Sequence, residues 1–315
     1  MSTIAYNGLI VTTVELKTEQ DGVPITSPKD HDGKTVYFES GSSNGTKAFF
    51  LTNIKGTFVR IWNPLRPSYW KYTATIVSPT KASEIVADGF GNGKETIPLF
   101  CIHGFLTPIH QMLERTEVAK GNFEEAGTYY PVPVIWPTQE NPLGYPFDQR
   151  SAEEAGELFR CFVECIPKGQ FPRKSLMMHS MGNFLVHSGK GENPLDVQFD
   201  NIFMVAADIP VDIFSKDPGN DDDKEKADNW KELLGNNGGK IFVVHSTGDI
   251  VLRLSASTVN FGEGPRIGLR GTTGNTRDGL KDVVENVNAT ENVDGHSYHY
   301  EKWTIQQYNE LPTKK

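Results

Sequence analysis

The stretch Ser175–Phe184 reads SLMMHSMGNF, and its interpretation decides that of the whole chain. An apolar run typical of a buried strand leads to His179 and Ser180, and Gly182 stands two residues after the serine. A serine hydroxyl becomes nucleophilic when a neighbouring base removes its proton, and a sharp strand-to-helix turn holds such a serine clear of its sheet. Small residues usually occupy the positions two before and two after it, because the turn leaves little room. Gly182 follows this rule and Met178 departs from it.

The pair His-Ser recurs along the chain, so the choice of nucleophile needs an argument. It stands at positions 179–180, 187–188, 245–246 and 296–297. Ser246 is the strongest competitor, because VVHSTGD also follows a strand-like run and has a glycine two residues on. Asp249 follows directly, however, and no histidine-bearing strand end with a separate acid remains downstream in the right order. Ser188 falls within an expected helix and Ser297 lies beside a better-placed histidine, so Ser180 is the predicted nucleophile.

After Thr96, single apolar runs alternate with helical patterns, which is typical of βαβ units and a parallel sheet. The strand candidates are IPLFCIH (97–103), VPVIW (132–136), SLMMH (175–179), IFMVAAD (202–208), KIFVVHS (240–246) and DVVENV (282–287). Most are too continuously apolar to be half exposed, so both faces of the sheet should be covered. Ser151 and Glu154 form a capping box before a helix whose apolar residues recur at helical spacing, and a last helix is expected from Tyr300 to Leu311.

The N-terminal segment has a different rhythm. Between Lys34 and Ser78, short β-branched and aromatic runs are separated by Gly, Asn and Pro, which predicts antiparallel strands. The expected fold class is therefore α/β, with a mostly parallel, doubly wound sheet and antiparallel N-terminal strands. We expect a single domain over residues 1–315, with a β-rich segment at 1–95 and the catalytic core at 96–315.

Composition limits the possible partners and compartments. The formal net charge is -9 and no Lys/Arg cluster occurs that would neutralise a phosphate backbone, so nucleic acid is not an expected partner. The N-terminus has no basic residues ahead of its short apolar run, and no run of 18 apolar residues follows. We therefore expect a cytoplasmic protein without a transmembrane segment. The sequence says nothing of its oligomeric state.

Two further groups complete a candidate acyl-transfer site. His103-Gly104-Phe105 ends the first parallel strand, and the backbone N–H groups of Phe105 and Met181 are expected to bind the oxyanion of a tetrahedral intermediate. His103 precedes the serine and is expected to pack beneath this loop. In VDGHSYHY, after the last strand, His296 is the expected base and His299 the fallback.

Two aspartates at strand ends compete for the role of the third residue, which orients the histidine. Asp249 in HSTGDIVL is favoured, because the strand ending at Ser246 is the last before the one that precedes His296. Asp208 in VAADIP lies one strand closer to the serine and is expected to bond backbone N–H groups where the chain turns. It remains the alternative acid.

The motifs HSMGN, VAADIP, DIVLRLS and DGHSYHY, in this order, resemble the α/β-hydrolase superfamily and, within it, serine esterase/lipase-like members of largely unknown function. The resemblance covers about Thr96 to His299. It implies a nucleophile elbow and a doubly wound sheet with serine, acid and histidine in chain order. This agrees with Ser180, Asp249 and His296 as the catalytic triad, with His179 and Gly182 at the elbow.

The leading hypothesis is a serine hydrolase that cleaves small-molecule carboxylic esters through an acyl-enzyme intermediate. A thioesterase or acyltransferase with the same triad, and a non-catalytic α/β-hydrolase-like binding protein, remain alternatives. No cofactor is expected. No metal is expected either, because His296 and His299 lack an H-E-x-x-H pattern or a carboxylate partner. The insertions Ser215–Gly239 and Val259–Gly279 are not apolar lids, which favours short or medium acyl esters.

Overall fold

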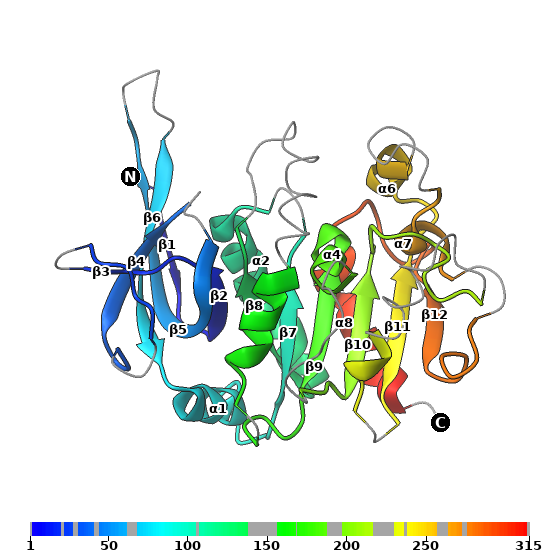
Figure 1. The fold of residues 1–315 in the computed structure, drawn as a ribbon, viewed down its shortest axis with the longest axis horizontal. Coiled ribbons are helices and arrows are strands. Elements are labelled where there is room, and N and C mark those ends of the chain that lie inside the picture. Colours follow the sequence, from blue (N-terminus) through cyan, green and yellow to red (C-terminus); the bar gives the residue numbers. More distant parts are fainter. Residues whose placement is uncertain are drawn as a thin grey trace.

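A computed structural model describes residues 2–19, 22–27, 31–40, 44–61, 68–104, 107–137, 156–167, 169–187, 197–216, 230–235, 238–256, 264–272 and 276–313. In these residues, twelve strands form one sheet. Its parallel part consists, in spatial order, of β12 (Val284–Asn288), β11 (Lys240–His245), β10 (Asn201–Val205), β9 (Ser175–His179), β7 (Ile97–Ile102) and β8 (Tyr129–Ile135) (Figure 1). All neighbouring pairs among these six strands are parallel, so the predicted fold class is confirmed.

The N-terminal strands extend the sheet on the β8 side. They are β1 (Thr3–Tyr6), β2 (Ile10–Val14), β3 (Lys17–Thr18), β4 (Thr35–Glu39), β5 (Asn44–Val59) and β6 (Tyr69–Val77). The predicted antiparallel pairing between residues 34 and 78 is confirmed by β4, β5 and β6. β2 pairs in parallel with β8 and antiparallel with β5, so it joins the two parts of the sheet. The sequence analysis did not identify β1 or β2.

Helices cover both faces of the parallel strands. They are α1 (Pro79–Asp88), α2 (Ile109–Ala126), α4 (Phe184–His187), α6 (Ile250–Leu254), α7 (Ile267–Arg270) and α8 (Lys302–Glu310), and residues 156–164 are also helical. On one face, Val86 and Phe162 join a buried apolar cluster with Met178 of β9. On the other, Phe123 and Ile305 pack in a second cluster. This two-sided burial explains why the strand sequences are almost entirely apolar.

Two helices expected from the sequence are both present, and parts of their surroundings lie outside the described residues. Leu158 and Phe162 lie buried in the helix at 156–164, as their spacing predicts, whereas Ser151 and Glu154 of the expected capping box lie outside the described residues. The final helix is confirmed as α8. Parts of both insertions, at 217–229, 236–237, 259–263 and 273–275, also lie outside the described residues.

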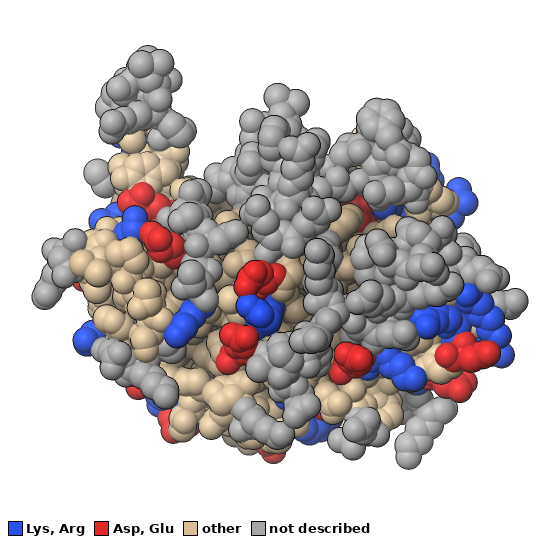
Figure 2. Space-filling view, viewed as in Figure 1, with Lys and Arg blue, Asp and Glu red and all other residues tan. Residues whose placement is uncertain are grey.

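The face of the molecule drawn in Figure 1 carries charges of both signs. Figure 2 shows Lys and Arg side chains lying close to Asp and Glu side chains, among uncharged residues, on the face drawn in Figure 1. Within the described part of the chain, no helix has the length and apolar character needed to cross a membrane.

Candidate active site

The serine of the opening motif lies on a strained turn. Ser180 follows β9 directly, begins a short 3-10 helix (Ser180–Asn183) and has a φ of 53°, a value that residues other than glycine rarely adopt. Such backbone strain costs about 1–3 kcal/mol and persists where the surroundings impose it, often at functional sites. A Cβ atom at Gly182 would lie 2.7 Å from the carbonyl oxygen of His103, so a larger residue does not fit there. The turn therefore has the features expected of a nucleophile elbow.

Met178, which departs from the small-residue rule, is a buried strand residue. It lies within β9, in register with Ile102 of β7 and Met204 of β10. Its side chain is fully buried in the apolar cluster that contains Met181 and Leu185. A flexible, unbranched thioether can fill such a space under the elbow.

Asn183 braces the turn, and the sequence analysis assigned it no role. Its buried side-chain amide donates hydrogen bonds to the carbonyl oxygens of Ser180, at 2.8 Å, and Met178, at 3.2 Å. The backbone N–H of Asp208 donates to the same Ser180 carbonyl at 3.3 Å. The signal for this bracing was present in HSMGN, because an asparagine three residues after the serine can reach back to the carbonyls of the turn.

His296 connects the serine to an aspartate. Its Nε2 lies 2.8 Å from Ser180 Oγ, and its Nδ1 lies 2.7 Å from Asp249 Oδ2. Asp249 is fully buried, whereas 13% of the His296 side chain is exposed. Because a carboxylate can only accept, Nδ1 carries the proton toward Asp249 and Nε2 can accept the serine proton. The three residues predicted as a triad are thus in one hydrogen-bonded line.

Asp249 is held by the turn that contains the competing serine. It is the N-cap of α6, and its Oδ1 accepts a hydrogen bond from the N–H of Leu252 at 3.0 Å. Ser246 is buried, and its Oγ accepts from the N–H of Gly248 at 3.3 Å. Its carbonyl accepts from the N–H of Asp249 at 3.2 Å. The contact with Asp249 is made by the main chain, so it is the backbone of Ser246 that helps to shape the turn that aims Asp249.

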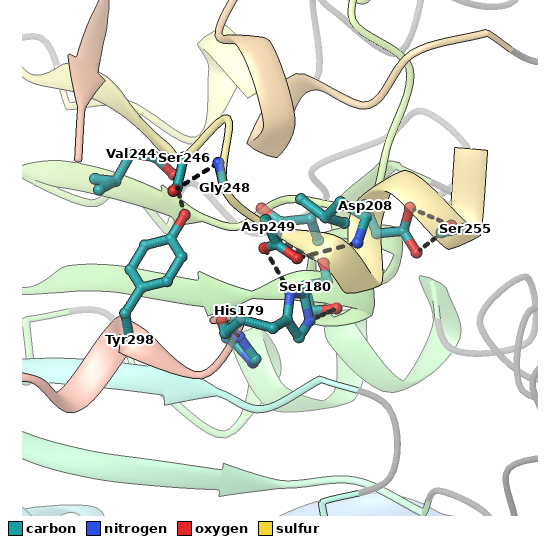
Figure 3. A network of polar contacts seen from close by, with 12 residues as sticks. His179, Ser180, Asp208, Val244, Ser246, Gly248, Asp249, Ser255 and Tyr298 are labelled. Carbon is teal, nitrogen blue, oxygen red and sulfur yellow. Dashed lines mark hydrogen bonds and ion pairs between the residues drawn. The ribbon is translucent and has the colours of Figure 1, made fainter. Parts of the chain in front are cut away.

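The alternative acid, Asp208, has other partners (Figure 3). The hydroxyl of Ser255, the C-cap residue of α6, lies 2.8 Å and 2.9 Å from the two carboxylate oxygens of Asp208. The Nε of Arg266 lies 3.1 Å from Asp208 Oδ1, and neither side chain is more than 2% exposed. Arg266 and Asp208 therefore form a buried ion pair. The carboxylate that contacts His296 is therefore that of Asp249. Asp208 instead interacts with Ser255 and Arg266.

The loop expected to supply oxyanion donors is described only in part. Phe105 lies outside the described residues, while Met181 directly follows Ser180 in the short 3-10 helix and is buried. Gly104 lies against the elbow, because a Cβ atom there would be 2.8 Å from Ser180 Cβ. His103 packs against Trp136, with ring centroids 5.4 Å apart, and burial lowers its pKa to about 4. It is therefore a neutral packing residue, as its place before the serine suggested.

The fallback base, His299, packs against the residue that precedes the serine. It is buried, and its ring stacks on His179 with a centroid distance of 4.0 Å. Burial, with Arg115 and His296 as further causes, lowers the pKa of His299 to about 3. Among the described residues, no group of three or more His, Cys, Asp or Glu side chains is arranged to hold a metal ion.

Residues 82–303 match the family model described as "Alpha/beta hydrolase of unknown function (DUF900)". No curated protein matches the chain. Among solved structures, S-formylglutathione hydrolase (FrmB) from Staphylococcus aureus is similar over 90% of this chain and 98% of its own, with 11% identity and a TM-score of 0.37. The propionate-bound esterase Est2 from Thermogutta terrifontis is similar over 96% of this chain and 92% of its own, with 12% identity and a TM-score of 0.36. Because the family model spans more than half of the sequence, the chain belongs to this family of alpha/beta hydrolases of unknown function.

Proposed function

We propose that the protein is a serine hydrolase that cleaves carboxylic esters through an acyl-enzyme, with Ser180 as nucleophile, His296 as general base and Asp249 as its partner. One observation carries the proposal: the line of hydrogen bonds from Ser180 Oγ through His296 to Asp249, which starts on a serine held at positive φ. A histidine within hydrogen-bond reach of the hydroxyl, and oriented by a third group, is the arrangement that nucleophilic acyl transfer requires.

In the first half of the reaction, Ser180 Oγ attacks the acyl carbonyl carbon while its proton passes to His296 Nε2. Asp249 accepts the Nδ1–H and stabilises the imidazolium that forms. The N–H of Met181 is the expected donor to the oxyanion from within the described residues. His296 then gives the proton to the leaving alkoxide, and the C–O bond of the ester breaks.

In the second half, water attacks the acyl-enzyme. His296 takes a proton from the water, the second tetrahedral intermediate collapses, and the carboxylic acid leaves as Ser180 regains its proton. The partial exposure of His296 supports this step, since the base must be reachable by water.

Thioester hydrolysis and acyl transfer use the same acyl-enzyme and remain finer alternatives. They differ in the leaving group or in the acceptor that replaces water. A binding protein without activity would have a misaligned serine. Against it stands the 2.8 Å contact between His296 Nε2 and Ser180 Oγ.

The test is hydrolysis of a p-nitrophenyl ester series from acetate to palmitate. Wild type is expected to cleave short and medium acyl chains, Ser180→Ala to lose the activity, and Ser246→Ala, the matched variant of the other strand-end His-Ser pair, to retain most of it. A thioester of the best acyl group then measures the preference for the leaving group. Activity in folded Ser180→Ala would contradict the nucleophile, and a steady rise to long chains with interfacial activation would contradict the proposed chain length.

A further inference from the structure

His179, the residue directly before the proposed nucleophile, contacts the proposed base. Its Nε2 lies 2.9 Å from the backbone carbonyl oxygen of His296. A carbonyl can only accept, so Nε2 carries the proton and donates. The rings of the two histidines are also close, with centroids 4.8 Å apart. A side chain of the nucleophile turn therefore holds the main chain of the base.

His296 lies in a segment that is neither helix nor strand. It lies in the segment between β12 and the short 3-10 helix Tyr298–Tyr300, where residues 289–297 form turns and bends rather than a helix or strand. Gly295, just before it, has a φ of 69°. Yet its imidazole must stay within hydrogen-bond distance of both Ser180 and Asp249. The bond from His179 fixes the main chain at the residue where this precision is needed.

The residues around His179 fix the position of its ring and favour one tautomer. The ring is buried, stacks on His299 and lies next to Gly104, where a Cβ atom would be 3.1 Å from His179 Nδ1. Burial lowers the pKa of His179 well below its usual value, and His299, His296 and Arg115 act in the same direction. The neutral ring has a single N–H, which is committed to the carbonyl of His296. It adds no second positive charge when His296 is protonated during the reaction.

We propose that His179 is a positioning residue: its Nε2–H holds the main chain of His296 and keeps the imidazole aligned between Ser180 and Asp249. This inference rests on the proposed serine hydrolase function. It predicts that loss of the N–H lowers kcat with little effect on KM, because the residue acts through the base rather than on the substrate. A displacement of about 1 Å in catalytic geometry can cost about 100-fold in rate.

The test compares variants at this position on one activated ester. His179→Phe keeps a ring for the stack but removes the donor, and we expect kcat to fall about 100-fold with KM within about threefold. His179→Gln keeps an N–H donor of similar reach and should recover much of that loss. His245→Phe is the matched control, because His245 is also buried and directly precedes a strand-end serine; its kcat should stay near that of wild type.

Circular dichroism establishes that each variant is folded, and His179→Met replaces His179→Phe if the larger ring prevents folding. A folded His179→Phe or His179→Met protein with normal kcat would overturn the inference, as would a His179→Gln protein no better than the variant without a donor. A wild type inert toward every ester would instead contradict the proposed function. The two failures are therefore distinguishable.

Discussion

The two buried aspartates at the strand ends should fail in different ways when each is changed to asparagine. Asp208→Asn removes the negative charge beside Arg266, whose side chain is fully buried. Breaking a buried ion pair typically costs about 3–5 kcal/mol of unfolding free energy. Asparagine keeps an acceptor oxygen for Ser255, so we expect the lower end, about 3 kcal/mol of unfolding free energy. The expected change in kcat is small.

Asp249→Asn should show the reverse pattern. The amide still caps α6 toward Leu252, so the loss of stability should be small. Its NH₂ group, however, favours the wrong tautomer of His296, and the expected fall in kcat is up to about 10⁴-fold. Asp249→Asn should therefore lower kcat and Asp208→Asn should lower the unfolding free energy, although both carboxylates are buried.

The assay is urea unfolding of each variant together with kcat on one p-nitrophenyl ester. Ser255→Ala is the matched control for the network, because it removes one hydroxyl and leaves the Asp208–Arg266 pair intact; about 1 kcal/mol of stability should be lost. A collapse of kcat in a stable Asp208→Asn protein, beside a nearly normal Asp249→Asn protein, would refute the reasoning and exchange the two roles.

Three further predictions concern the elbow and its surroundings. Met178→Ala should keep or raise activity while losing about 2–5 kcal/mol of stability in urea unfolding, since it empties a buried site; complete inactivity of the folded variant would mean that the turn is misread. Gly104→Ala should lower kcat, because the added Cβ would lie 2.8 Å from Ser180 Cβ. Gly121→Ala is the control and should leave kcat unchanged, because no atom lies within 4 Å of a Cβ added there. Equal kcat values for the two variants would contradict this prediction. The unfolding free energy should fall as the pH drops from 6.5 toward 4, because His103 binds a proton in the unfolded chain but stays neutral in the folded one. Each histidine that is kept neutral in this way should contribute about 1.4 kcal/mol per pH unit. Urea unfolding at pH 7 and pH 5 measures the slope, and in His103→Phe the slope should be shallower.

The parallel core was predictable because its strands lie under helices on both faces and therefore leave continuous apolar runs. β2 was missed because Thr12 and Thr13 interrupt its apolar run, although both are buried. All five residues of Ile10–Val14 are buried, so the segment lacks the alternation that marks a half-exposed strand, and it is too short to stand out. Only its pairing with β8 and β5 reveals its place in the sheet.

The sequence predicted the three central residues of the candidate site, but not the contacts that hold them in place. The positions of Ser180, Asp249 and His296 follow from strand ends and chain order, and the structure brings their side chains together. The ion pair between Asp208 and Arg266 could not be predicted, because Arg266 lies in an insertion far along the chain and no local sequence pattern links the two residues. The contact from His179 to His296 joins two segments in the same way, and only the folded chain shows it.

The most direct test of the central claim is reaction of the folded protein with a fluorophosphonate, followed by intact mass measurement and peptide mapping. Ser180 is expected to gain one covalent adduct, because the reagent traps a serine whose proton a neighbouring base removes. Ser180→Ala should remain unlabelled, and Ser246→Ala should be labelled like wild type. A folded wild type that takes up no adduct, or an adduct mapped to Ser246, would contradict the account.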